Sequence, residues 1–196
     1  MSKMLEGIKK INFKKYLVFL VYFFAIVIFA IVIDQVTKVI AMNFLTLGEP
    51  VTFIPHFIEF TLVFNKGAAF GMGDDALWIR IIFVLLSWIV AIGILIYVSH
   101  LMYKNKNINT FFGVCLALIL GGDVGNLIDR TFYWTNPCGV IDFIDVTPLI
   151  PNFGIFNIAD SFVVVGVIIL LVSLIVDIFK GDDKKSSEKE ELNKLK

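Results

Sequence analysis

The sequence reads GGDVGNLIDR at residues 121–130, VIDFID at 140–145 and FNIADSF at 156–162, between two long apolar segments. This region holds five carboxylates and one guanidinium: Asp123, Asp129, Asp142, Asp145, Asp160 and Arg130. Charge at the edge of a hydrocarbon layer is costly, so such residues mark a functional site by default. We therefore expect the rest of the chain to hold this cluster at a fixed depth in a membrane.

The composition excludes an ordinary soluble domain. Of the 196 residues 58% are hydrophobic and 17% are charged, with a mean hydropathy of +0.87, whereas soluble domains are about 45–50% apolar and about 25% charged. Cys115 lies in an apolar run and Cys138 in a polar loop, which argues against a disulfide, and no CxxC pair suggests zinc or redox chemistry. The composition indicates a polytopic membrane protein.

Four apolar runs are each long enough for a membrane span of roughly 20 residues. The predicted spans are residues 16–33, 76–98, 108–128 and 156–179. The first is a retained anchor rather than a cleaved signal, because it ends in IVIDQVTK and three further runs follow. The expected organisation is a basic leader (1–15), a four-span domain (16–180) and a mixed-charge tail (181–196) that is solvated or partly helical.

Positive charges are distributed unevenly about these spans. Thirteen lysines fall in the N-terminal leader, the 99–107 loop and the segment from Lys180 onward, against four basic residues on the other side. Because cytoplasmic loops are enriched in Lys and Arg, both termini are expected in the cytoplasm. The acidic cluster then faces outward.

The first outward segment predicts a small β-sheet. VTFIPHF (51–57) is followed by IEFTLVF (58–64), in which Phe60, Leu62 and Phe64 alternate with Glu59, Thr61 and Val63. The glycines of NKGAAFGMG (65–73) end the strands. A Phe-rich sheet over residues 49–73 favours contact with lipid or with a lipidated partner. The predicted fold is an all-α integral membrane protein, a four-transmembrane-helix bundle with a small extracytoplasmic β-sheet and loop region.

Helical spacing decides which polar residues at the outer ends of the spans can meet. Asp34 and Lys38 are four residues apart and share a helix face. Two further sets share a face in the same way, Asn126 with Asp129 and Arg130, and Asn157 with Asp160.

Each set also has a structural interpretation. Asp34–Lys38 is then a structural tie, Asp129–Arg130 a boundary salt bridge, and Asp160 a carboxylate that interacts with a helix dipole. For Asp129 the salt bridge is the favoured interpretation. Three other acids are expected to be solvated loop charges: Asp74, Asp75 and Asp145.

The remaining chemistry is that of carboxylates. There is no HExxH motif, and His56 and His100 fall on opposite sides of the membrane, so a zinc hydrolase lacks ligands. No GxSxG elbow surrounds Ser161. Two carboxylates that share a proton can activate water and protonate a leaving amine without a metal or cofactor.

The ordered motifs IDQVTK, FNKGAAFG, GNLIDR, VIDFID and FNIADS resemble those of bacterial lipoprotein signal peptidase (signal peptidase II) over roughly residues 16–180. The resemblance implies an aspartyl endopeptidase that cleaves diacylglyceryl-modified prolipoproteins just before the lipidated cysteine. It implies Asp142 and Asp160 as the catalytic pair, with Asn65 and Arg130 beside the substrate. The other matching positions imply supporting roles: Asp34, Lys38, Gly67, Asn126, Asp129, Asn157 and Ala159.

The same resemblance implies the cellular setting. It places the enzyme in the bacterial cytoplasmic (inner) membrane, with its active site on the extracytoplasmic face. It implies membrane lipid as surroundings, inhibition by globomycin-like cyclic peptides, a monomer, and no nucleic-acid partner. In this setting Lys38 is also a candidate contact for lipid phosphate. Asp123 and the long 131–141 loop depart from the family pattern, and the residues alone assign Asp123 no role.

Two interpretations from other classes remain. A small transporter or channel subunit also carries intramembrane carboxylates, but it predicts acids near the midplane and broken spans. A non-catalytic membrane scaffold with ion-paired span ends predicts that Asp142→Asn alters stability but not turnover.

Overall fold

The computed structural model describes residues 13–66, 77–104, 110–133 and 139–194. Its helices are α2 (Phe13–Phe44), α3 (Leu77–Tyr103), α4 (Thr110–Phe132) and α5 (Ile158–Lys194). Its strands are β1 (Val51–Ile54), β2 (Ile58–Asn65) and β3 (Val140–Asp145). The predicted class of four long helices with a small sheet is confirmed.

All four helices contain a stretch long and apolar enough to cross a membrane. The stretches are residues 14–44, 78–103, 110–132 and 158–176. The first helix continues beyond Asp34 as predicted, which brings Lys38 into the same helix. α5 extends to Lys194, so the charged tail predicted from residue 181 begins within a helix.

The helices bury one face and leave a second, apolar face uncovered. Phe23 and Ala117 are fully buried in a cluster that joins α2, α3 and α4. On α3, by contrast, Ile89 and Ile96 are 66% and 64% exposed. Apolar exposure on this scale is expected where lipid replaces water as the solvent.

The sheet is antiparallel, with strand order β1-β2-β3. Phe60 of β2 joins the three strands, because its ring lies 5.1 Å from that of Phe53 and 6.4 Å from that of Phe143, measured between centroids. Cross-strand aromatic contacts of this kind stabilise a sheet. The two predicted strands of the 49–73 segment are confirmed.

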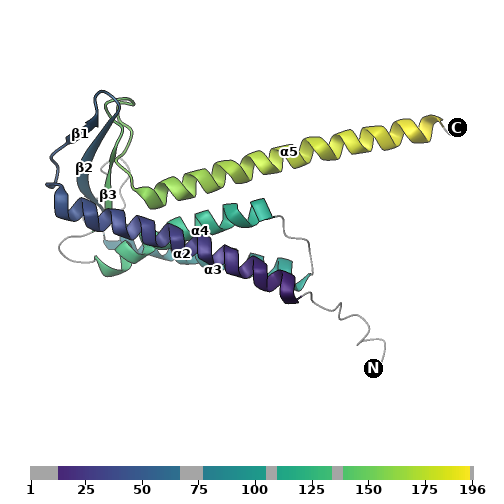
Figure 1. The fold of residues 1–196 in the computed structure, drawn as a ribbon, viewed down its shortest axis with the longest axis horizontal. Helices are drawn as coiled ribbons and strands as arrows, with labels where there is room; N and C mark the ends of the chain where they lie inside the picture. The colour runs from purple at the N-terminus through teal and green to yellow at the C-terminus, as the bar shows by residue number, and fades with distance from the viewer. Residues whose placement is uncertain (1–12, 67–76, 105–109, 134–138, 195–196) are drawn as a thin grey trace.

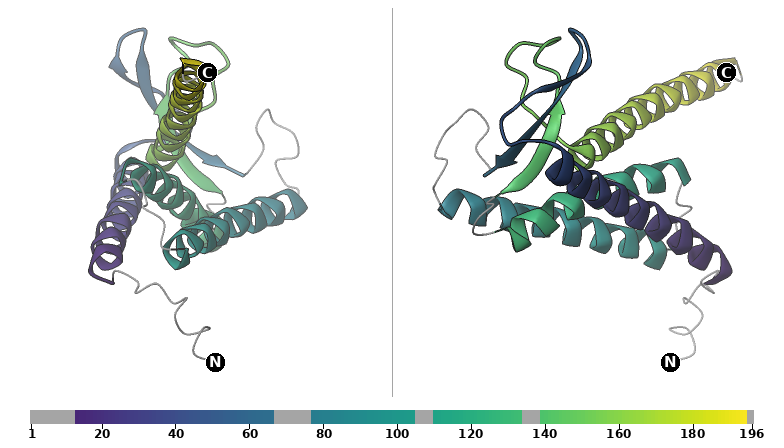
Figure 2. Two further views of the ribbon diagram at one scale, coloured as in Figure 1. Left: turned by 90° about the vertical axis from the view of Figure 1, so that its right-hand side faces the viewer. Right: turned by 60° about the vertical axis from the view of Figure 1, so that its left-hand side comes forward.

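The sheet lies at one end of the helices, where α2 and α4 end and α5 begins (Figures 1 and 2). Figure 1 shows the C-terminal part of α5, in yellow, projecting beyond the other helices. The beginning of α5 packs closely on α4, because a Cβ on Gly122 would lie 2.8 Å from the side chain of Val163. The polar ends of α2, α4 and α5 therefore meet beside β3.

Candidate active site

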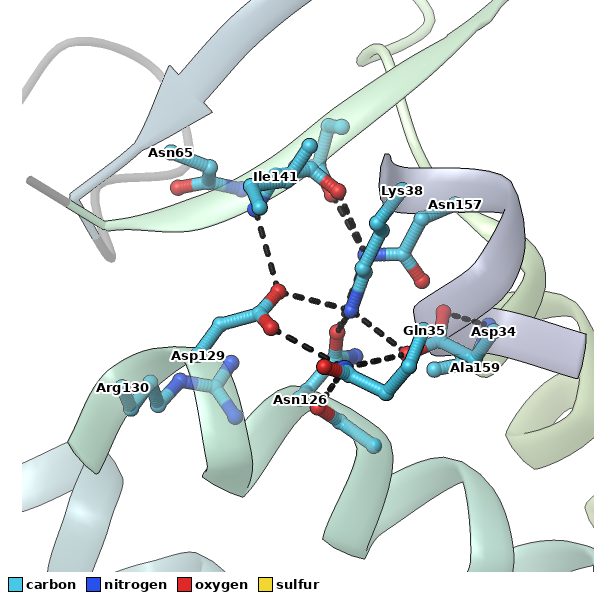
Figure 3. Close-up of polar contacts among 12 residues, drawn as sticks. Asp34, Gln35, Lys38, Asn65, Asn126, Asp129, Arg130, Ile141, Asn157 and Ala159 are labelled. Atoms are coloured by element: carbon cyan, nitrogen blue, oxygen red, sulfur yellow. Dashed lines mark hydrogen bonds and ion pairs between the residues drawn. The ribbon is translucent and has the colours of Figure 1, made fainter. Parts of the chain in front are cut away.

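Lys38 lies at the centre of a buried polar cluster (Figure 3). Its ammonium lies 2.7 Å from a carboxylate oxygen of Asp34 and 2.7 Å from one of Asp129, and it donates to Asn126 Oδ1 at 3.0 Å. Lys38 is 1% exposed, and both acids are 0% exposed. The predicted Asp34–Lys38 pair is confirmed as a buried tie.

Two expectations about this cluster are wrong. Asp129 pairs with Lys38 and not with Arg130, because the buried ammonium lies on the neighbouring helix α2. Lys38 is enclosed by its acidic partners, so its ammonium is not available to lipid phosphate.

Gln35 is a member of the cluster that the sequence did not single out. Its amide nitrogen donates to Asp34 Oδ2 at 3.2 Å, to the Gly125 carbonyl at 3.1 Å and to Asp129 Oδ1 at 3.0 Å. Its position one residue after Asp34, at the polar end of an apolar run, was the only available signal. Gln35 thereby ties α2 to α4.

Asp34 also holds the start of α5. Its Oδ1 accepts a hydrogen bond from the backbone N–H of Ala159 at 2.9 Å. A carboxylate at a helix N-terminus satisfies a free N–H and interacts favourably with the helix dipole. Ala159 thus joins the site through its backbone, while Gly67 lies outside the residues that the structure describes.

Asp142 is 1% exposed and lies on β3, paired with Val63 of β2. No strand was predicted at VIDFID, which pairs with β2. Asn65 Nδ2 donates to Asp142 Oδ2 at 2.9 Å, and Asn157 Nδ2 donates to Asp142 Oδ1 at 2.6 Å. Two side-chain amides therefore fix both oxygens of this carboxyl group.

Asp160 lies in the first turn of α5 and forms a capping box with Asn157. The Asp160 N–H donates to Asn157 Oδ1 at 2.9 Å, and the Asn157 N–H donates to Asp160 Oδ2 at 3.2 Å. The expected helix-end role of Asp160 is therefore present. Asp160 Oδ1 also accepts from Asn126 Nδ2 at 2.7 Å.

A chain of amides connects the two aspartates. Asn157 Nδ2 donates to both Asp142 and Asn126 Oδ1, the latter at 2.9 Å, and Asn126 donates in turn to Asp160. This arrangement holds the carboxyl groups of a strand and of a helix in one network. Burial, followed by the negative charge of Asp160, raises the pKa of Asp142 to about 7.

Arg130 reaches the same region from α4. Its guanidinium donates to Ser87 Oγ of α3 at 3.3 Å and lies 5.6 Å from the centre of the Phe83 ring. Among the carboxylates, Asp160 has the largest electrostatic interaction with it. Arg130 and Asn65 line one small cavity, so the two predicted substrate contacts face a common space.

Asp145 is not the solvated loop charge that we expected. It is 6% exposed and accepts hydrogen bonds from Thr61 Oγ1 at 3.0 Å and from the Thr147 N–H at 2.9 Å. Burial acts to raise the pKa of Asp145, but the bonds from Thr147 and Thr61 hold it below its usual value. Asp145 ties the end of β3 to β2, while Asp74 and Asp75 lie outside the described residues.

The described part of the chain contains no group of three or more His, Cys, Asp or Glu side chains arranged to hold a metal ion. The polar groups of the site instead pair with ammonium, amide and backbone donors of the chain itself. The arrangement offers two neighbouring carboxyl groups, one of which titrates near neutral pH. Such a pair can exchange a proton with water or with a leaving group.

Residues 26–176 match the family model described as signal peptidase (SPase) II. The chain is 38% identical to the lipoprotein signal peptidase of Halalkalibacterium halodurans over 85% of its own length and 98% of that protein. It is 36% identical to the lipoprotein signal peptidases of Listeria monocytogenes (80% and 94% covered) and Staphylococcus aureus (82% and 91% covered).

Solved structures also resemble this fold. A bacterial membrane enzyme solved by the in meso method superposes with a TM-score of 0.67 at 32% identity, covering 80% of this chain and 89% of that one. A second structure with the same description gives a TM-score of 0.65 at 33% identity, covering 78% and 92%. The structural similarity therefore extends over most of this chain.

Proposed function

Because this chain belongs to the signal peptidase II family, a family of membrane proteases that process lipoproteins, we propose that it is an aspartyl endopeptidase. Its substrate is a diacylglyceryl-modified prolipoprotein, which it cleaves N-terminal to the lipidated cysteine. Asp142 and Asp160 are the catalytic pair, and water is the nucleophile. The observation that carries this proposal is the buried amide network that joins the two carboxyl groups.

The raised pKa of Asp142 supports a division of labour within the pair. With a pKa of about 7, Asp142 retains a proton near neutral pH, while Asp160 accepts hydrogen bonds suited to a carboxylate. Asp160 takes a proton from water as the water oxygen attacks the scissile carbonyl carbon. Asp142 supplies the proton that the leaving amine requires when the C–N bond breaks.

Asn65 and Arg130 hold the peptide by donating hydrogen bonds to its carbonyl groups. Their position on one cavity supports this role. A guanidinium provides several donors in a fixed plane, which suits a peptide backbone. The supporting residues do not contact the substrate. Lys38 pairs with both Asp34 and Asp129, and Asn126 and Asn157 orient the catalytic acids.

The apolar outer face of the sheet supports contact with lipid. Phe53 of β1 and Phe57, in the turn between β1 and β2, are 63% and 52% exposed. We place this face against the outer leaflet, where it receives the lipid-bearing part of the substrate. The lysine distribution supports cytoplasmic termini and an extracytoplasmic site in the bacterial inner membrane, and we expect the enzyme to act as a monomer.

The test is cleavage by the purified protein in detergent. A diacylglyceryl-modified precursor is expected to be cut, its unmodified counterpart is not, and globomycin is expected to inhibit. Asp142→Asn and Asp160→Asn are expected to abolish cleavage while the protein stays folded. Asp145→Asn, on the same strand as Asp142, is the matched control. It is expected to lose some stability, because Asp145 accepts bonds from Thr61 and Thr147, but to retain turnover. Normal turnover by Asp142→Asn or Asp160→Asn would contradict the aspartyl mechanism and favour a non-catalytic scaffold.

A further inference from the structure

We propose that Asp123 and Ser87 form a positioning relay that holds Arg130 at the site. The inference rests on the proposed function, in which Arg130 binds substrate. Asp123 and Arg130 are seven residues apart on α4, so they lie two turns apart on the same helix face. Ser87 faces them from α3.

Ser87 connects the two charged groups. It is 5% exposed, accepts a hydrogen bond from Arg130 Nη1 at 3.3 Å, and lies close enough to the Asp123 carboxylate to stabilise its charged form. A hydroxyl can accept from a guanidinium while its own hydrogen is donated to a carboxylate. Ser87 therefore accepts from Arg130 and can direct its own hydrogen toward Asp123.

Asp123 depends on Arg130 for charge compensation. Its Oδ2 is buried and has no hydrogen-bond partner among the residues that the structure describes. This contrasts with Asp34, whose two oxygens receive an ammonium, an amide and a backbone N–H. A carboxylate in an apolar helix is costly unless it is paired, and Arg130 is the cation that attracts it.

Arg130 in turn depends on Asp123. After Asp160, Asp123 has the largest electrostatic interaction with the guanidinium among the carboxylates, ahead of Asp142 and Asp129. Ser87 binds the guanidinium from α3, and Asp160 of α5 attracts it electrostatically. Without Asp123 and Ser87, the acidic pair alone would attract Arg130, and a closer ion pair there would draw it away from the substrate cavity.

The first experiment uses kinetics. Asp123→Ala is expected to lower kcat/KM for the diacylglyceryl-modified precursor about tenfold, mainly through a higher KM, which is the size expected for a misplaced charged hydrogen bond. Ser87→Ala is expected to produce a smaller loss of the same kind. Ser99→Ala is the matched control, because Ser99 lies on the exposed face of α3 and donates only to the Leu95 carbonyl.

A double-mutant cycle separates positioning from a general structural effect. In an Arg130→Ala background, Asp123→Ala is expected to cause no further loss of the residual kcat/KM, because the relay then has nothing to hold. Additive losses, or a wild-type KM for Asp123→Ala, would overturn the relay. A wild-type protein that fails to cut the modified precursor would contradict the proposed function instead.

A second readout needs no activity. Asp123→Asn preserves the shape of the side chain and removes its charge. In the Arg130→Ala background this change is expected to raise the Tm, because it removes a buried carboxylate that has lost its cation. In the wild-type background Asp123→Asn is expected to give a smaller rise in Tm, or a fall. Equal shifts of Tm in the two backgrounds would overturn the relay whether or not the protein cleaves a precursor.

Discussion

Asn157 and Asp160 exchange two hydrogen bonds across the first turn of α5, with the Asp160 N–H on Asn157 Oδ1 at 2.9 Å and the Asn157 N–H on Asp160 Oδ2 at 3.2 Å. The same asparagine uses its Nδ2 to bind Asp142 at 2.6 Å. One residue therefore begins a membrane helix and also orients a carboxyl group on a separate strand. These two tasks can be separated by mutation.

We expect Asn157→Ala to lose both the helix cap and turnover. Loss of a cap costs about 1 kcal/mol of stability. Asn157→Ser retains an oxygen that can cap the helix but has no amide to donate to Asp142 or Asn126. Thermal unfolding should therefore show recovery in the serine variant, while its kcat stays as low as that of the alanine variant. Near-normal turnover by Asn157→Ser would contradict the orienting role.

We expect kcat/KM to fall as the pH rises through about 7. The pKa of Asp142 is raised to about 7 by burial and by Asp160, so the proton that the pair shares is lost above that pH. The hydrogen bond from Asn65 lowers this pKa, because it stabilises the charged form. Asn65→Ala should therefore move the alkaline limb of the pH profile to higher pH, even though its overall rate is lower.

The control for that profile is Asp145→Asn, which should leave the position of the limb unchanged. A profile of Asn65→Ala that shifts to lower pH would show that Asp142 does not set the alkaline limb. Activity that increases steadily from pH 7 to pH 9 would assign the essential proton to a different group.

We expect Lys38→Met to be among the most damaging single changes. It leaves Asp34 and Asp129 buried without their cation, and breaking a buried ion pair by removing one partner costs about 3–5 kcal/mol. The midpoint of unfolding in detergent measures this cost. Adding Asp129→Asn should recover part of the loss, because it removes one uncompensated charge.

Lys104→Met provides the comparison, since Lys104 is exposed at the end of α3 and exposed charges contribute about 0–1 kcal/mol. Equal effects of the two lysine substitutions on the unfolding midpoint would show that burial does not increase the contribution of Lys38 to stability.

We expect Gly125→Ala to disturb the site through packing alone. A Cβ at this position would lie 2.7 Å from Asp34 Oδ2 and 3.2 Å from the Ala159 Cβ, which is closer than side chains tolerate. The carboxylate that binds Lys38 and the Ala159 N–H would have to move. Loss of both Tm and turnover is expected, measured by thermal unfolding and precursor cleavage.

Gly93→Ala is the matched control within a membrane helix. Among the described residues, no atom beyond the adjacent turns of α3 lies within 4 Å of a Cβ at this position, and alanine favours a helix over glycine by about 1 kcal/mol. An unchanged or slightly higher Tm is therefore expected. A neutral Gly125→Ala would show that α4 can move away from α2 without affecting the site.

Local patterns in the sequence were sufficient to predict the helices, two of the strands and the Asp34–Lys38 pair. Long runs of apolar residues directly indicate membrane spans, and a spacing of four residues indicates a shared helix face. The third strand was missed because VIDFID is six residues long and follows a polar loop. Its strand conformation depends on pairing with β2, more than seventy residues earlier in the chain.

Partner choice within the cluster was not predictable from spacing. Asp129 is adjacent to Arg130 in sequence, yet consecutive residues on a helix point in different directions. The side chain of Asp129 points toward α2, where it pairs with Lys38. Gln35 and Ser87 were missed for a related reason. A single polar residue in an apolar helix shows its role only once the facing helix is known.

The ion pairs of Lys38 have a consequence for how the protein is made. Lys38 is synthesised with the first span, long before Asp129 and Ala159 leave the ribosome. A bare ammonium would oppose transfer of that span into the bilayer, but Asp34 is one turn away and neutralises it from the start. The part of the first span that follows Lys15 can therefore enter the membrane with no net charge, and when the third span arrives the same lysine becomes the point on which the two helices dock.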